Sequence, residues 1–181
     1  KGGQPGVHFD GGANDIIFRR CYLSSFNAFG AAITELTFDE CTFYYATDGM
    51  WDATHNGVNL WGKTNLINTT FVFDGQAQVE WIGLNGATEA GDEIVLTGCK
   101  VVDGEGKERP LFNYFANYDE GDKVTIDGVV YTLGDGSVMD ENGTQIVYSE
   151  AGLKEALENG GTVVLANPFT IDQSESNGYG K

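Results

Sequence analysis

Side chains that could recognise a sugar gather in one stretch of the sequence, "YYATDGMWDATHNGVNLWG", which spans residues 44–62. Aromatic rings offer flat faces that can stack on sugar rings, while carboxylate and amide groups bond to hydroxyls. The stretch therefore predicts a glycan-binding loop between two strands, to which a later tryptophan could add one more ring. The predicted glycan-binding residues are Tyr44, Tyr45, Asp48, Trp51, Asp52, His55, Trp61 and Trp81.

A catalytic site is the alternative to a binding loop that would make the more specific claim about residues 44–62. Asp48, Asp52 or His55 could move protons, and glycoside hydrolysis uses a pair of carboxylic acids. No clear pair of aspartates stands out, however, and arginine, which a sugar-acid site would use, is scarce. We therefore predict no catalytic residue. Aromatic side chains that only cover a flank of the protein are the alternative to a binding loop.

The cysteines and the acidic turns point away from a metal site. Cys21, Cys41 and Cys99 are odd in number and follow no CxxC spacing, so they predict neither a disulfide framework nor a zinc site. Burial as small apolar side chains explains them best. Residues 135–143, "DGSVMDENG", lack the spacing of an EF-hand loop and predict a turn. We expect no metal site and no cofactor, with Ca²⁺ as the alternative.

The charge of the chain argues against one class of partner, and its hydropathy argues against another. The net charge is −17, with 27 acidic against 10 basic side chains. Nucleic acids are not expected, because phosphate binding needs clustered Lys and Arg. Membrane insertion is not expected either, because no run approaches the ~20 apolar residues of a transmembrane helix. The opening "KGGQPG", which lacks Met, suggests a mature product or an excised piece.

A repeated phrase, apolar-x-apolar-x-x-Cys-x-apolar, indicates the elements that would position such a site. Alternation with a period of two predicts a strand with one buried face, and the two-residue break predicts a bend that keeps this face buried. Gly98 and Gly128 stand at the break, where positive φ is expected. The full copies are Ile16, Phe18, Cys21 and Leu23; Leu36, Phe38, Cys41 and Phe43; and Ile94, Leu96, Cys99 and Val101. The weaker copies are Leu66, Asn68, Phe71 and Phe73, and Val124, Ile126, Val129 and Tyr131.

The phrase also predicts a fold. Shorter apolar runs at 6–9, 30–33, 57–62 and 81–86 precede most copies, so each repeat would hold roughly three short strands, as in one coil of a parallel β-helix. The phrase resembles the "I-x-F-x-N-C-x-F" coil of right-handed parallel β-helix proteins of the pectin-lyase-like superfamily. The resemblance covers residues 6–103. It implies an all-β, right-handed parallel β-helix of about four to five coils, with the cysteines in an interior ladder.

The C-terminal third has different signals. Residues 123–147 hold Asp-Gly and Asn-Gly pairs between alternating apolar residues, which predicts β-hairpins. Ser149 is expected to cap a short helix that ends at Gly160-Gly161, and a strand from Thr162 to Leu165 should follow. This helix either packs on the last coil of its own chain, covers the open coil of a neighbouring molecule, or begins another β-helix. We expect parallel coils in residues 1–103, a β-hairpin or closing appendage in 104–148, and a capping helix plus strand in 149–181 that begins a next β-helix unit or takes part in assembly.

Together these features predict a non-catalytic structural or adhesion module of an extracellular, cell-surface or virion protein. Its expected partner is a polysaccharide or another glycan surface. The resemblance allows a bacterial adhesin or a phage tail appendage, because both use this scaffold, and the scaffold alone does not fix the function. Two alternatives remain open. One is a polysaccharide lyase or glycoside hydrolase, and the other is the subunit of a head-to-tail filament, which the late position of the capping segment favours.

Overall fold

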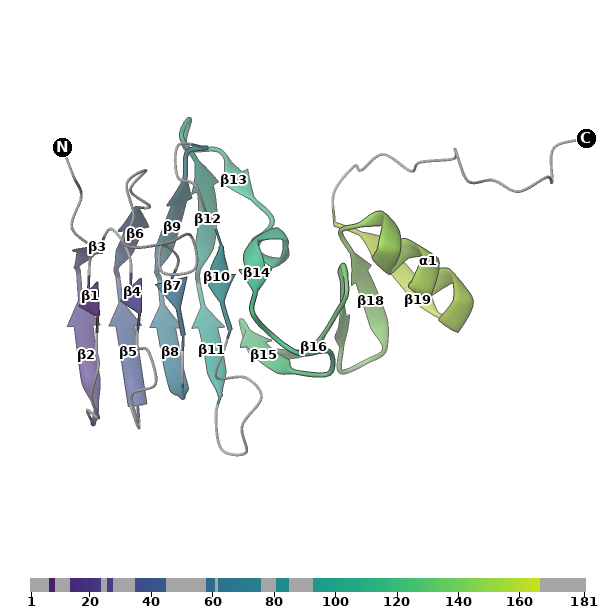
Figure 1. Cartoon of the computed structure of the whole chain (residues 1–181), viewed down its shortest axis with the longest axis horizontal. Coiled ribbons are helices and arrows are strands. Elements are labelled where there is room, and N and C mark those ends of the chain that lie inside the picture. Colours follow the sequence, from purple (N-terminus) through teal and green to yellow (C-terminus); the bar gives the residue numbers. More distant parts are fainter. Residues whose placement is uncertain are drawn as a thin grey trace, which may run out of the picture.

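The computed structural model describes residues 7–8, 14–23, 26–27, 35–44, 58–60, 62–75, 81–84 and 93–166. These residues form short β-strands, one 3-10 helix, η2 (Leu111–Tyr114), and one α-helix, α1 (Glu150–Asn159). In Figure 1 the parallel strands stand side by side from β2 at one end of the molecule, and α1 lies at the opposite end. The described part of the protein is thus mostly β, with one α-helix.

Three open sheets contain the described strands. The first has the order β1 (Val7–His8), β4 (Phe26–Asn27), β7 (Val58–Asn59), β10 (Ile82–Gly83) and β14 (Phe115–Ala116). The second has the order β19 (Thr162–Leu165), β18 (Thr144–Val147), β17 (Ser137–Asp140), β16 (Val129–Gly134), β15 (Lys123–Ile126), β11 (Ile94–Thr97), β8 (Lys63–Ile67), β5 (Glu35–Asp39) and β2 (Ile16–Arg19). The third has the order β13 (Glu108–Arg109), β12 (Lys100–Asp103), β9 (Thr70–Phe73), β6 (Thr42–Tyr44) and β3 (Tyr22–Leu23).

The repeated phrase predicts the pairing of its first two full copies correctly. Leu36 of β5 lies opposite Ile16 of β2, and Phe38 lies opposite Phe18. Leu36 and Phe38 are fully buried, whereas Thr37 between them is partly exposed. Because successive side chains of a strand point to opposite faces, this alternation gives the sheet one apolar face, which packs into the core.

The break in the phrase is a bend with left-handed backbone conformation. Arg20, Glu40, Asn68 and Gly98 occupy it with φ of 53°, 54°, 49° and 62°. The backbone N–H groups of the first three donate to carbonyl oxygens of the neighbouring strand at 2.8–2.9 Å. This conformation costs a non-glycine residue about 1 kcal/mol, and the stacked hydrogen bonds offset that cost.

One weaker copy of the phrase, predicted at Leu66, Asn68, Phe71 and Phe73, was placed two residues too late in the sequence. Phe71 pairs with Phe43 of the neighbouring strand, so Thr69 and not Phe71 stands in the cysteine position. Thr64 pairs with Leu36 and takes the preceding apolar place. Both threonines are fully buried. This copy was missed because two of its buried positions hold threonine. A search for alternating apolar residues does not find a buried threonine whose hydroxyl has a hydrogen-bond partner.

The predicted fold class, a right-handed parallel β-helix of about four to five coils, is wrong. The sheets are open and mixed instead of closed or solenoidal. The nine-stranded sheet continues from parallel strands into the antiparallel strands β15 to β18, and β12 pairs antiparallel with β13. Apolar periodicity reports which face of a strand is buried, not how one sheet is joined to the next. Joining segments such as 28–34 and 45–57 lie outside the described residues.

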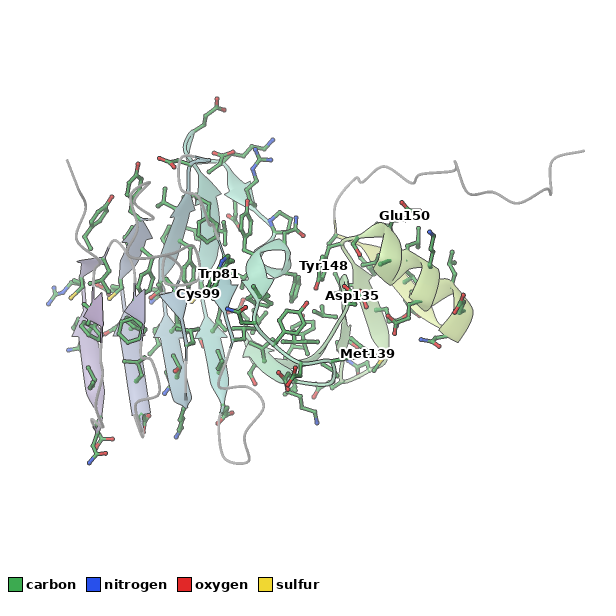
Figure 2. The ribbon with its side chains drawn as sticks, in the orientation of Figure 1. Trp81, Cys99, Asp135, Met139, Tyr148 and Glu150 are labelled. Carbon is green, nitrogen blue, oxygen red and sulfur yellow. The ribbon has the colours of Figure 1, made fainter. Side chains whose placement is uncertain are left out.

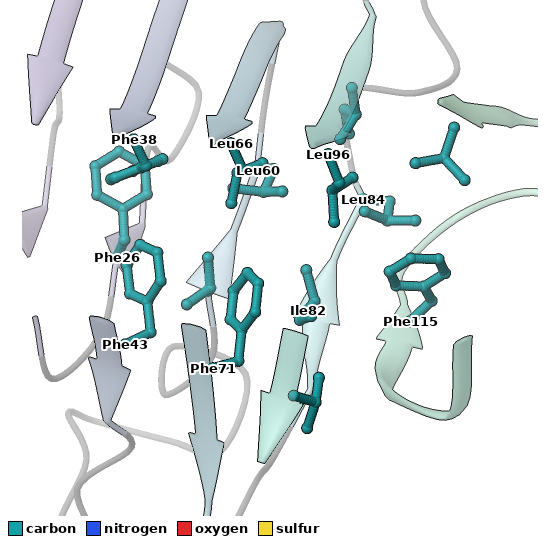
Figure 3. Packing of buried hydrophobic residues seen from close by; sticks show 14 of the residues in the cluster. Phe26, Phe38, Phe43, Leu60, Leu66, Phe71, Ile82, Leu84, Leu96 and Phe115 are labelled. Atoms are coloured by element: carbon teal, nitrogen blue, oxygen red, sulfur yellow. The ribbon is translucent and has the colours of Figure 1, made fainter. Parts of the chain in front are cut away.

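Aromatic rings from all three sheets meet in one core (Figure 3). Phe38 of the second sheet contacts Phe26 of the first and Phe43 of the third edge to face, with ring centroids 5.0 Å apart in both pairs. Phe43 in turn stacks on Phe71 at 5.4 Å. All four rings are fully buried. Such pairs stabilise a core beyond the area they bury, so the three sheets pack as one body.

The C-terminal part is an antiparallel meander followed by α1 and β19. Here the predicted turns and helix are confirmed. β15 and β16 turn at Asp127-Gly128, with φ of 48° and 83°, and β17 and β18 turn around Asn142-Gly143. The side chain of Ser149 accepts a hydrogen bond from the N–H of Gly152 at 3.1 Å and caps α1. β19 then pairs in parallel with β18 and ends the nine-stranded sheet.

Candidate functional site

Tyr44 and Trp81 are the predicted glycan-binding residues that belong to the described part of the chain. Tyr44 is the last residue of β6 in the third sheet, whereas Trp81 directly precedes β10 in the first sheet. Figure 2 shows Trp81 among the parallel strands. The two residues therefore belong to different sheets. The other predicted residues lie outside the described residues: Tyr45, Asp48, Trp51, Asp52, His55 and Trp61.

Tyr44 is one half of a stacked pair of tyrosines on the outer surface of the third sheet. Its ring centroid lies 6.1 Å from that of Tyr22 on β3, and the ring planes differ by 22°. The adjacent residues Leu23 and Phe43 are buried in the core, so strand alternation turns both tyrosines outward. Tyr22 is 70% exposed, which is a large exposure for an aromatic side chain.

A carboxylate anchors this pair. The hydroxyl of Tyr44 donates to Asp74 Oδ2 at 2.5 Å, and Asp74 directly follows β9. This hydrogen bond to a carboxylate is the main cause that raises the pKa of Tyr44 above its ordinary value, so the phenol keeps its proton. We call Tyr22, Tyr44 and Asp74 the tyrosine site.

Polar side chains continue the outer face beside the tyrosine site. Tyr22 lies in register with Thr42 of β6, which lies in register with Thr70 of β9 and then with Lys100 of β12. Thr42 and Thr70 are partly exposed and Lys100 is exposed. Hydroxyls both donate and accept hydrogen bonds, and an ammonium group donates them. The face thus combines an exposed ring with a row of hydrogen-bonding groups.

Other carboxylates on the sheets bind basic partners. Arg19 Nε lies 2.8 Å from Asp39 Oδ2, and Arg109 Nη2 lies 2.7 Å from Asp103 Oδ2. Asp103 also accepts the backbone N–H of Lys107, which is the first cause that holds its pKa below the ordinary value. These two aspartates therefore stabilise strand edges and turns.

Metal binding finds no support in the described ranges, which contain no group of three or more His, Cys, Asp or Glu side chains that could hold an ion. In the segment 135–143, the side chain of Asp140 accepts hydrogen bonds from the backbone N–H groups of Asn142 and Thr144 at 2.9 Å and 2.8 Å. The aspartate thus closes the turn that follows β17, whereas residues 137–140 of the segment predicted as a turn form this strand.

The cysteines are free thiols that pack against the backbone. Cys41 is buried, while Cys21 and Cys99 are half-buried. The Sγ atom of Cys41 lies 3.4 Å from the carbonyl oxygen of Phe18, and that of Cys99 lies 3.4 Å from the carbonyl oxygen of Leu66. Burial raises the pKa of Cys99 to about 11, so this thiol is a poor nucleophile at neutral pH.

Tyr22 and Asp74 were missed at the level of sequence. A signal in the sequence was present only for Tyr22. Tyr22 stands between Cys21 and Leu23, in a place of the phrase that faces outward, where an aromatic ring cannot contribute to the core. Asp74 follows the strand that neighbours Tyr44. Register, and not local spacing, brings it to the tyrosine.

Comparisons with protein-family models, with curated proteins and with solved structures find no match. Among the described residues, no helix has the length and apolar character needed to cross a membrane. The fold and the site together define a mostly β protein that presents an exposed tyrosine, stacked on a partly exposed one, beside a carboxylate. Its function is inferred from this geometry.

Proposed function

We propose that the chain is a structural or adhesion module of an extracellular, cell-surface or virion protein, and that its tyrosine site binds a glycan. The observation that carries the proposal is the exposed ring of Tyr22, which stacks on Tyr44, whose hydroxyl in turn donates to Asp74.

A ring that is both exposed and held in place is suited to stacking on a sugar. Tyr22 is 70% exposed, yet it lies against Tyr44, and Tyr44 is fixed by its hydrogen bond to Asp74. Ordering a flexible side chain on binding costs about 0.5–1.5 kcal/mol. A ring that is ordered beforehand avoids most of that cost, so the pair forms a prepared surface for a ligand with a flat apolar face.

The surroundings favour a ligand with many hydroxyl groups. The partly exposed Thr42 and Thr70 offer hydroxyls on the face of the third sheet beside Tyr44 and its partner Asp74. Apolar stacking together with several hydrogen bonds at its rim is the combination that fixes orientation in small-ligand sites.

The charge of the protein narrows the class of glycan. A chain with net charge −17 repels polyanions, and the repulsion is strongest at low ionic strength. We therefore expect neutral polysaccharides to bind more tightly than acidic ones.

The test is to incubate the protein with a panel of neutral and acidic polysaccharides and to measure both binding and the length of the polysaccharide chains. Tyr22→Ala should weaken binding about tenfold, since ring contacts contribute about 1–1.5 kcal/mol. Asp74→Asn should weaken it as well. The matched control is Ile67→Ala, because Ile67 is another exposed large side chain, on β8 of the second sheet.

Two results would overturn the proposal. Binding that Ile67→Ala reduces as much as Tyr22→Ala would show that the tyrosine site is not the contact. Shortening of the polysaccharide would replace an adhesion module by a polysaccharide lyase or glycoside hydrolase.

A further inference from the structure

The core is less well covered at the end formed by β2 than at the neighbouring strand β5. Ile16 and Phe18 of β2 are partly exposed, whereas Leu36 and Phe38, their partners on β5, are completely buried. Cys21 shows the same contrast with the buried Cys41. The residues at this end are thus apolar, like those of the core, but they are only partly buried.

The edge strand at this end is apolar and open. β2 is the last strand of the nine-stranded sheet, and among the described residues no strand pairs with its outer edge. Ile17 at its centre is 63% exposed. An unpaired strand edge presents backbone N–H and C=O groups in a row, which is a template for pairing with another chain.

The opposite end of the same sheet has a second open edge. Within the described ranges, β19 pairs only with β18. Its residues Val164 and Leu165 are 46% and 58% exposed, and Leu157 on the neighbouring α1 is 70% exposed. β19 itself reads "TVVL", without charge or proline, so it lacks the common devices that protect an edge strand. Figure 1 shows that β2 and α1 lie at opposite ends of the molecule.

We propose that a second copy of this chain occupies these edges, so that β19 of one copy pairs with β2 of the next and the molecules join head to tail. The two edges belong to one sheet, so each added copy continues that sheet. A contact between two different surfaces of the same protein does not close on itself unless the rotation between copies makes a ring. The expected product is therefore a chain of copies.

Charge favours this pairing over contacts between like ends. Arg20 lies exposed at the β2 end, in a protein whose net charge is −17, while the neighbouring Arg19 is paired with Asp39. At the other end α1 carries Glu155 and Glu158, next to the exposed Leu157. Head-to-tail contact brings Arg20 towards these glutamates, whereas contact between two α1 ends places their carboxylates together, which disfavours association.

The test is analytical ultracentrifugation of the whole chain over a wide concentration range. The wild type should form a concentration-dependent series of oligomers. Ile17→Lys and Val164→Lys each place a charge on one edge, and each variant on its own should be monomeric, because every head-to-tail contact needs both edges. The matched control is Met139→Lys, because Met139 is 41% exposed on β17, which is paired on both sides. This variant should assemble like the wild type.

Mixing the two edge variants separates head-to-tail contact from its rivals. Ile17→Lys retains an intact β19 edge and Val164→Lys retains an intact β2 edge, so the mixture should form dimers and nothing larger. Contacts between two β19 edges would leave the Ile17→Lys variant dimeric on its own. A wild type that stays monomeric at every concentration would refute the proposal, as would a Met139→Lys variant that dissociates.

Arg20→Glu provides a milder variant in case a lysine on an edge strand prevents folding. It reverses a charge at an exposed bend and leaves the strand itself unchanged. This variant should associate more weakly, so its oligomers should dissociate at a higher protein concentration than those of the wild type. Undiminished association at low salt would refute the part of the argument that rests on charge. The assembly proposal does not rest on glycan binding, because none of these substitutions touches the tyrosine site.

Discussion

A buried hydroxyl repeats the role of the thiols at the bend of the strands. Thr69 stands in register between the positions of Cys41 and Cys99, and its Oγ1 donates to the carbonyl oxygen of Phe38 at 3.3 Å. The Sγ atoms of the two cysteines approach the equivalent carbonyls at 3.4 Å. Cysteine and threonine are interchangeable here because both fit the space and both can donate a hydrogen bond.

We therefore predict that Thr69→Cys is tolerated better than Thr69→Val. The valine matches the shape of threonine but cannot donate, so it should lower the free energy of unfolding by about 1 kcal/mol. The thiol should lower it by less than that. Urea unfolding of both variants would measure the difference. If the valine variant were the more stable of the two, shape alone would govern this position.

Two partly buried acidic groups, the thiol of Cys99 and the phenol of Tyr148, are expected to make the protein sensitive to alkali. Burial raises the pKa of Cys99 from its ordinary value of 9.0 to about 11. Burial, together with its hydrogen bond to Tyr118 at 3.1 Å, also raises the pKa of Tyr148 above its ordinary value. When the folded-state pKa of an acid is raised, the unfolded chain loses the proton more readily. The stability is then complete below the unfolded pKa and is lost as the pH rises above it.

We predict that the free energy of unfolding changes little between pH 7 and about pH 9 and falls above that range. Tyr148→Phe should be less stable than the wild type at neutral pH by about 1 kcal/mol, because the hydrogen bond to Tyr118 is lost. The gap should shrink at about pH 11, since phenylalanine has no proton to lose. Thermal unfolding of both proteins at the two pH values is the measurement. A gap that stays constant with pH would show that Tyr148 does not contribute to alkaline unfolding.

At the scale of elements, two glycines allow the helix to pack closely on the meander. Gly136 lies in the turn between β16 and β17 with φ of 73°, and a Cβ at this position would collide with the side chain of Ser149. A Cβ on Gly152 in α1 would collide with the backbone of Gly136. The helix cap and the turn therefore touch without room for a methyl group, which fixes the place where α1 begins.

We predict that Gly136→Ala destabilises the protein by at least 2 kcal/mol, because the positive φ costs about 1 kcal/mol and the collision with Ser149 adds to it. Gly143→Ala is the matched control. Gly143 has φ of 79° in the next turn, but a Cβ there meets nothing within 4 Å. Its variant should lose only about 1 kcal/mol. Equal urea midpoints for the two variants would mean that α1 shifts to make room.

The sequence is informative about elements with strong local signals. Ser149, the Asp127-Gly128 turn and the alternation around Phe38 each act within a few residues, so the helix, a hairpin and the strand could be predicted. Thr64 and Thr69 could not be recognised as core residues, because both are polar residue types, and the hydroxyl of Thr69 is satisfied by the carbonyl of Phe38 on a neighbouring strand.

Local sequence patterns could not predict how the sheets are joined, and they could not predict the tyrosine site. Alternation fixes a buried face and suggests which strands are alike, but a closed coil and an open sheet share the same alternation. Tyr22 and Asp74 are separated in the sequence by more than two strands and meet Tyr44 only through the register of the third sheet. Predicting such a site requires the pairing of strands, which depends on the whole molecule.

At the scale of the whole molecule, the two proposals together make a prediction that neither makes alone. Head-to-tail copies would repeat the tyrosine site along an assembly, so one long polysaccharide could contact several copies. Linked sites can raise the overall affinity by 10²–10⁴-fold without any new contact. A short oligosaccharide that reaches one site gains nothing from the repetition.

We therefore predict that Ile17→Lys, which leaves Tyr22, Tyr44 and Asp74 in place, weakens binding to a long neutral polysaccharide by at least about tenfold. Its affinity for a short oligosaccharide of the same sugar should equal that of the wild type. Calorimetry with both ligands would measure the two affinities. Tyr22→Ala is the complementary variant and should weaken binding of both ligands while leaving assembly intact. If Ile17→Lys weakened both ligands alike, the β2 edge would belong to the sugar site itself, and the exposed apolar side chain of Ile17 would be explained by glycan contact instead of by a second copy.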